Sequence, residues 1–194
     1  MDIDKMRNDL SIRGKNGLPF LMAATIIWLI ITVIYFQSGL DIKTKNIFMF
    51  IFTGLMLPLA VGFSKVIKAE WKFDHPLGNL GLLFNLAQFI YFPIIFWAFI
   101  KSPSEMVVFF AIITGAHLLP YGWFYNVRAY YILAPVTSLL IFLLSLQTSI
   151  ALWFIPLVMA ALLVILNICL YVDYKSKKRD INGETSINQH RLHV

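Results

Sequence analysis

Apolar residues occur along the chain in six runs separated by short polar segments. Each run has about twenty residues, and a helix rising about 1.5 Å per residue then crosses the roughly 30 Å hydrocarbon core of a bilayer. The alternation of apolar and polar residues that marks transmembrane β-strands is absent. The pattern therefore predicts an all-α integral membrane bundle of six transmembrane helices. The predicted spans are residues 18–36, 47–67, 80–100, 106–125, 130–146 and 150–172.

Composition divides the 194 residues into three segments. Residues 1–17 are expected to form a cytoplasmic N-terminal segment, either a short helix in the membrane interface with Ile3, Met6 and Leu10 on one face, or a frayed tail. Residues 18–172 form the predicted six-helix transmembrane domain. Residues 173–194 are polar and basic, and they are predicted to be a disordered cytoplasmic tail.

Lysine and arginine are distributed unequally between the two sides of the predicted bundle. The side that carries both termini holds 13 of the 16 basic residues. Because Lys and Arg are enriched on the cytoplasmic side, both termini are predicted to be cytoplasmic. Trp97 and Trp153 at one predicted boundary and Trp71 and Trp123 at the other fit aromatic belts at the headgroups. Topology thus explains the net charge of +6, with the lipid bilayer as the partner and no nucleic acid expected.

The polar side chains within the predicted spans gather in their cytoplasmic half. His117 is the one titratable side chain at depth, and no Asp, Glu, Lys or Arg lies in the central part of a span. Asn85 and Gln88 share a helical face, and helical rise places them at a similar depth to His117. Three further polar residues lie at comparable depths: Thr137, Ser138 and Asn167. These six residues are predicted to line a cytoplasm-facing polar cavity.

Prolines are expected to break the helices near this depth. Pro93, Pro120 and Pro135 each lack an amide donor and crowd the carbonyl four residues earlier. For Pro120 that carbonyl belongs to Ala116, next to His117, and broken helices form substrate sites in many transporters. The alternative is that the prolines only bend the helices and that His117 is a packing residue.

Signatures of enzymes, metal sites and cofactors are missing. The chain has no His-Glu-x-x-His, Gly-x-Ser-x-Gly, Cys-x-x-Cys or phosphate-binding glycine loop. Glu70, Asp74 and His75 lie close in sequence, but their spacing matches no zinc pattern and favours a solvated turn. The sequence therefore favours a non-enzymatic protein without cofactor or metal.

Several stretches resemble a family of small bacterial multi-pass membrane proteins that carries a domain-of-unknown-function label. They are "KNGLPFLMAATIIWLIIT", "LNLAQFIYFPIIFWAF" and "FFAIITGAHLLPYGWFYN", followed by "AYY". The resemblance extends from about Lys5 to the sixth span. It implies a bacterial plasma-membrane location and no particular activity.

Two functional hypotheses follow from these observations. The first is a multi-pass protein of the bacterial plasma membrane that binds or transports a small molecule or ion through the polar cavity. The second is a non-transporting sensor, immunity or assembly component whose helices only pack. Six short-looped spans are few for a lone transporter, so the first hypothesis is compatible with a homodimer.

Overall fold

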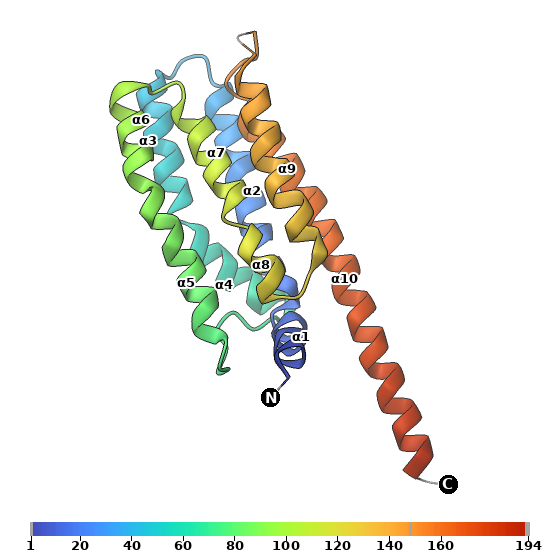
Figure 1. Ribbon diagram of the computed structural model, residues 1–194. Helices are drawn as coiled ribbons and strands as arrows, with labels where there is room; N and C mark the ends of the chain where they lie inside the picture. Colours follow the sequence, from blue (N-terminus) through green and yellow to red (C-terminus); the bar gives the residue numbers. More distant parts are fainter. Residues whose placement is uncertain (1, 148, 193–194) are drawn as a thin grey trace.

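A computed structural model describes residues 2–147 and 149–192, and the described part of the chain is helical without strands (Figure 1). The all-α prediction is confirmed. The α-helices are α1 (Ile3–Arg13), α2 (Leu18–Phe36), α3 (Ile42–Thr53), α4 (Met56–Ile67), α5 (Gly78–Ala87), α6 (Phe92–Lys101), α7 (Met106–Ala116), α8 (Leu119–Phe124), α9 (Arg128–Ser145) and α10 (Phe154–Leu192). Two 3₁₀ turns join them, η1 (Lys15–Gly17) and η2 (Gln88–Tyr91).

The helices are long and apolar enough to cross a membrane. Five stretches meet this condition, and α3 with α4 makes a sixth if the bent pair is one span. Large apolar side chains remain exposed on their outer faces, among them Val33, Ile90, Ile132 and Val172. Exposed apolar surface of this extent is unusual on a soluble protein, and lipid is its natural cover. The chain is therefore a multi-pass membrane protein.

Three spans are interrupted, each shortly before a proline. α3 and α4 meet at a 41° bend, η2 separates α5 from α6, and His117 and Leu118 separate α7 from α8. Pro93 and Pro120 lie in the first turn of α6 and α8, where a missing N–H removes no intrahelical bond. The expected break at Pro135 is wrong, because α9 continues through it. A proline in a helix interior removes a single hydrogen bond, and the contacts of α9 with α7 and α10 keep the helix continuous.

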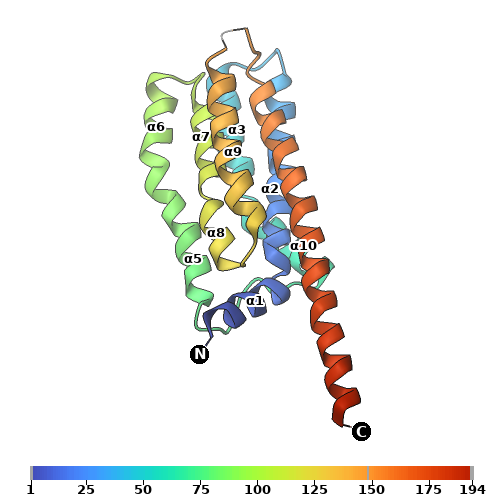
Figure 2. The same ribbon diagram turned by 45° about the vertical axis from the view of Figure 1, so that its right-hand side comes forward.

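α2 lies near the centre of the bundle and contacts α3, α4 and α10, while α9 contacts α7, α8 and α10. Figures 1 and 2 show both termini at one end, together with the α4–α5 loop and the α8–α9 connection. We call this the basic end, because it carries Lys5, Lys68, Arg128 and Lys178. α1 lies across the basic end, roughly perpendicular to the bundle (Figure 2).

The two terminal segments are helical. Residues 3–13 form α1, whose N-terminus is capped by the Asp2 side chain, and its placement in a membrane interface stays a prediction. The disordered tail expected from residue 173 is wrong for the described residues, because α10 continues to Leu192 and projects beyond the bundle. Side-chain contacts hold the first turns of this extension. Lys177 pairs with Asp173 at 3.0 Å, and its ammonium also donates to the carbonyl of Asn126 at 2.8 Å.

α1 turns into α2 through three consecutive residues in the left-handed region. Their φ values are 48° for Lys15, 58° for Asn16 and 79° for Gly17. A Cβ atom on Gly17 would lie 2.8 Å from the Tyr125 ring and 3.1 Å from the Tyr130 hydroxyl. The turn therefore needs glycine at this position both for its backbone angle and for the close approach of the two rings.

We expect Gly17→Ala to lower the free energy of unfolding by about 2–4 kcal/mol, through left-handed strain and overpacking together. Gly62→Ala is the matched control, because nothing lies within 4 Å of its Cβ position and the change favours the helix. Thermal unfolding in detergent, followed by circular dichroism, compares the two. Equal stabilities would show that the tight turn is not formed.

The side of the membrane on which the basic end lies can be tested with single cysteines in a Cys169→Ser background. Gly39→Cys lies in the exposed α2–α3 loop, and Lys178→Cys lies on the exposed surface of α10. If both termini are cytoplasmic, a membrane-impermeant maleimide added to intact cells labels Gly39→Cys and leaves Lys178→Cys unlabelled until the membrane is opened. The opposite pattern would reverse the orientation.

Candidate functional site

Thr137 and Ser138 form a helix-packing contact. A Cβ atom on Gly115 would lie 2.8 Å from the Ser138 hydroxyl and 3.0 Å from the Thr137 methyl, so α7 and α9 approach closely at this glycine. The Ser138 hydroxyl lies 3.1 Å from the carbonyl oxygen of Ile112 on α7. The Ser138 hydroxyl is thus engaged between the two helices and Thr137 packs there through its methyl group, as is usual where membrane helices meet at small residues.

His117 lies at the break between α7 and α8, where it is half-buried. Its Nδ1 lies 2.7 Å from the carbonyl oxygen of Thr114 and donates to it, since a carbonyl only accepts. Its ring packs edge-on against Tyr121, with the centroids 6.0 Å apart. The imidazole therefore satisfies part of the polar backbone that the helix break exposes.

Asn85 and Gln88 lie on the neighbouring span. The side chain of Asn85 donates to the carbonyl of Gly81 in its own helix at 2.9 Å, and Gln88 begins the 3₁₀ turn η2. Among the described residues, no hydrogen bond joins either side chain to His117. The structure therefore does not join these three residues into one polar site.

Asn167 on α10 is different, because its amide oxygen is unpaired. Its Nδ2 donates to the carbonyl of Leu163 at 2.9 Å and to the hydroxyl of Thr25 at 3.1 Å. The Thr25 hydroxyl donates its own proton to the carbonyl of Leu21 at 2.8 Å. Both neighbours can only accept from Asn167, which fixes the orientation of the amide. Its Oδ1 is buried and has no hydrogen-bond partner among the described residues.

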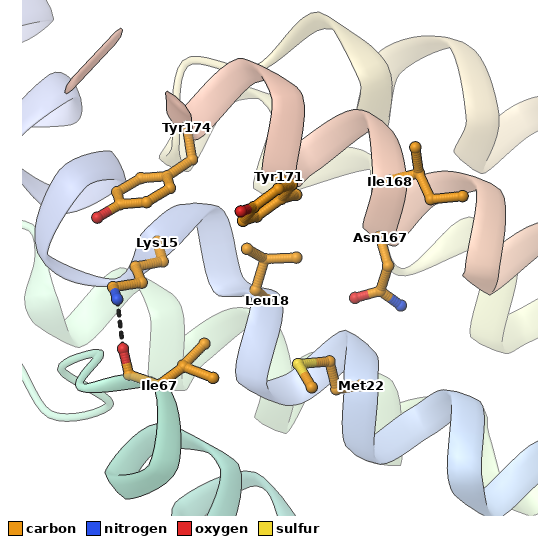
Figure 3. A pocket seen from close by; sticks show the side chains of 8 residues that line it. All are labelled: Lys15, Leu18, Met22, Ile67, Asn167, Ile168, Tyr171 and Tyr174. Carbon is orange, nitrogen blue, oxygen red and sulfur yellow. Dashed lines mark hydrogen bonds between the residues drawn. The ribbon is translucent and has the colours of Figure 1, made fainter. Parts of the chain in front are cut away.

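Asn167 lines a cavity of about 420 Å³ between α2, α10 and the end of α4. The other lining residues are Lys15, Leu18, Met22, Ile67, Ile168, Tyr171 and Tyr174 (Figure 3). Of the six residues that the sequence predicted to share a cavity, only Asn167 lies here. The sequence predicted a polar cavity, whereas the lining of this cavity is mainly apolar and aromatic.

The cavity has a polar group near each end. Figure 3 shows Asn167 and Met22 toward one end and Lys15 and Tyr174 toward the other. The Lys15 ammonium donates to the carbonyl of Ile67, the last residue of α4, and lies 5.5 Å from the centre of the Tyr174 ring. Asn167 and Tyr174 are seven residues apart on α10. Helical rise therefore separates Asn167 from Tyr174, the ring beside the Lys15 ammonium, by about 10 Å along α10.

Lys15 is held in place by its neighbour Asn16, which is fully buried. The Asn16 amide donates to the carbonyl of Leu170 at 3.0 Å and to the carboxylate of Asp173 at 2.9 Å. Its Oδ1 accepts from the Ser11 hydroxyl at 2.5 Å, and its backbone carbonyl accepts from the Tyr130 hydroxyl at 2.8 Å. Asn16 thus connects α1, α9 and α10 beside the cavity.

Charged pairs fix the outer side of α1. Arg13 donates to Glu70 at 2.6 Å and to Asp9 at 3.1 Å. The hydrogen bond that Arg13 donates to Glu70, followed by the one that it donates to Asp9, raises the pKa of the Arg13 guanidinium above its ordinary value. These groups are largely exposed, so the pairs contribute about 0–1 kcal/mol each. They orient α1 more than they stabilise it.

The cluster of Glu70, Asp74 and His75 forms no metal site in the described part of the chain. Glu70 pairs with Arg13, and Nδ1 of His75 accepts from the backbone N–H of Leu77 at 3.1 Å. Glu70 therefore joins the loop to α1, and His75 closes a turn within the loop.

A family model described as "Family of unknown function (DUF7010)" matches residues 3–173. The chain belongs to this family. The match confirms the resemblance to a domain-of-unknown-function family, and it spans α1 and every residue of the cavity except Tyr174. No curated protein and no solved structure matches the sequence significantly.

Sequence reasoning missed Lys15, Tyr171 and Tyr174 as parts of a site. Each lies at the edge of a predicted span, where anchoring cations and aromatic rings are common. A signal that could have drawn attention to Lys15 is its position between Gly14 and Asn16-Gly17, because this composition favours left-handed turns. Such a turn changes the direction in which the lysine points.

The two asparagines give a stability test of these environments. Asn16→Ala should lower the free energy of unfolding by about 3 kcal/mol, since it leaves buried partners unpaired. Asn167→Leu should leave stability nearly unchanged, because removal of the buried unpaired oxygen offsets the loss of the hydrogen bond from Nδ2 to Thr25. Thermal unfolding of both variants in one detergent measures the difference. Asn16→Gly, which tolerates the left-handed backbone, separates the side-chain loss from backbone strain. A large destabilisation by Asn167→Leu would mean that the hydrogen bond to Thr25 outweighs the cost of the unpaired oxygen.

Proposed function

We propose that this protein is a multi-pass component of the bacterial plasma membrane that binds a small amphiphilic molecule in the cavity between α2, α4 and α10. The observation that carries the proposal is an apolar and aromatic cavity with Asn167 in its lining, the unpaired Oδ1 of that residue being buried behind the lining surface. As the sequence suggested, the proposed ligand is a small molecule and the site lies near the basic end, which we take to be cytoplasmic. Of the six candidate cavity residues named from the sequence, only Asn167 belongs to the proposed site. The location is supported by the charge distribution and by the resemblance to bacterial membrane proteins.

An unpaired acceptor beside an apolar cavity gains a partner when the Asn167 side chain turns toward a ligand that carries a hydrogen-bond donor. Leaving a buried polar group without a partner costs about 1–3 kcal/mol, so a ligand that donates a hydrogen bond there recovers part of that free energy. A volume of about 420 Å³ falls within the range of small-molecule pockets, roughly 300–1,000 Å³. The complementary ligand has an apolar body and a hydroxyl group.

The cavity is open toward the side of the bundle. Ile168 and Tyr171 line it and are 58% and 47% exposed, on the outer face of α10. In a membrane, this face is in contact with lipid chains, so an amphiphile reaches the site sideways from the leaflet. The cavity lies toward the basic end, which supports binding from that leaflet and does not require passage across the bilayer.

The probe for this proposal is methyl 10-hydroxystearate, a neutral chain with one hydroxyl group, compared with methyl stearate. A saturating ligand at about a hundred times its Kd adds about 2.7 kcal/mol, which corresponds to about 5–10 °C in Tm for a chain of this size. We expect this shift for methyl 10-hydroxystearate and a smaller one for methyl stearate. Asn167→Leu should remove the difference by weakening the hydroxylated probe about 3–10-fold.

Ser138→Ala is the matched control, because it removes a polar group from a span away from the cavity. It should leave the preference for the hydroxylated probe unchanged. Met22→Trp, which fills the cavity, should weaken both probes together. If the wild-type protein and Asn167→Leu respond alike to the two esters, the probes bind elsewhere and the proposed function is wrong.

A further inference from the structure

We infer that the ligand is a long-chain carboxylate that bears a hydroxyl group partway along its chain, with the carboxylate at Lys15 and the hydroxyl at Asn167. This inference rests on the proposed binding site and names the class of its ligand. It comes from the electrostatics of the cavity and from the separation of its two polar groups.

Lys15 is the only charged residue among those that line the cavity. Its ammonium has three donors, and one is used by the carbonyl of Ile67. Among the described residues, no carboxylate forms an ion pair with Lys15. The positive charge of the half-buried Lys15 ammonium is only partly compensated by one neutral acceptor. An oxyanion bound beside it would supply the missing hydrogen-bond acceptors and the opposite charge.

The acidic residues of this region are already engaged. Asp173 pairs with Lys177 at 3.0 Å and accepts from Asn16, while Glu70 pairs with Arg13 at 2.6 Å. Further positive charge lies nearby, because the Lys175 ammonium is 4.9 Å from the ring of Tyr171, which lines the cavity. The end of the cavity at Lys15 is therefore complementary to an anion.

The backbone at Lys15 supports a role for its side chain. Two non-glycine residues in succession, Lys15 and Asn16, adopt the left-handed region, which costs about 1–2 kcal/mol for each. The hydrogen bonds of Asn16 over-determine this conformation, and its result is that the lysine points toward the end of α4 and the cavity (Figure 3). Backbone strain of this kind is concentrated at functional sites.

Within the lining itself, the single ammonium of Lys15 matches a single negative charge. A carboxylate carries one charge, whereas a phosphate monoester carries about 1.5–2 at neutral pH, and recognition of phosphate commonly uses arginine or several cations. From Asn167 to Tyr174, the ring beside the Lys15 ammonium, α10 rises about 10 Å in roughly two turns. An apolar spacer of that length runs along Leu18 and Tyr171, which places the hydroxyl group well inside the chain of the ligand.

The experiment compares 10-hydroxystearate with its methyl ester, which differ only in the charge at the head. We expect wild-type protein in detergent to bind the acid about tenfold or more tightly than the ester, measured from Tm as a function of probe concentration. Lys15→Met should remove this preference, and Lys15→Arg should retain most of it. Lys101→Met, at the opposite end of the bundle, is the matched control and should change nothing.

The ratio of acid to ester is read within each variant, so a change in basal stability does not affect it. Stearate adds a second comparison, because Asn167→Leu should abolish the preference for 10-hydroxystearate over stearate while Lys15→Met preserves it. If the wild-type protein binds the ester as tightly as the acid, or Lys15→Met weakens both equally, this inference is overturned. If Asn167→Leu instead keeps the preference for the hydroxylated probe in both the ester and the acid series, the proposed function is overturned.

Discussion

The structure of the basic end depends on the hydrogen bonds that the buried Asn16 makes with several helices. The Asn16 side chain is fully buried, accepts a hydrogen bond from Ser11 and donates to Leu170 and Asp173. The Asn16 backbone carbonyl accepts from Tyr130. Buried polar groups are costly unless every donor and acceptor is used, and this amide uses its groups on several elements at once. The position of α1, the direction of Lys15 and the spacing of α2 from α10 follow from it.

The cavity can be understood as the space that this arrangement leaves open. α2 and α10 are held together at Asn16 and Leu170 and again at Thr25 and Asn167. Between these two contacts the lining residues do not fill the volume, although most membrane-protein interiors are closely packed. The two contacts also explain its chemistry, because one leaves a buried amide oxygen without a partner next to the lining and the other directs an ammonium to the rim.

The fold was accessible from the sequence because hydrophobic run length and helical rise are local properties. α2 begins and ends where the first run does, and the other spans lie within a few residues of their runs. The extension of α10 was missed, since it is stabilised by Lys177 binding to the carbonyls of Tyr125 and Asn126, which are about fifty residues away. The composition of the C-terminal segment does not indicate a contact with residues so distant in the sequence.

The candidate site was less accessible for a related reason. Polarity at depth pointed to His117, whose Nδ1 proves to be bonded to the carbonyl of Thr114. Asn167 was identified by the same criterion, but its partner in the cavity, Lys15, lies at a span boundary and more than 150 residues earlier in the chain. Which polar side chain keeps a free acceptor depends on the neighbours that packing supplies, and depth alone does not reveal it.

α10 carries both Asn167 and Lys177 on one uninterrupted helix. The first residue faces the cavity, and the second holds the Ser11 hydroxyl of α1 at 3.0 Å. A continuous helix turns and slides as a rod, so its ends cannot move independently. Any rotation of α10 that changes the shape of the cavity therefore also displaces Lys177 and its hydrogen bond to α1. The projecting end of α10 then moves farther than Asn167 or Lys177.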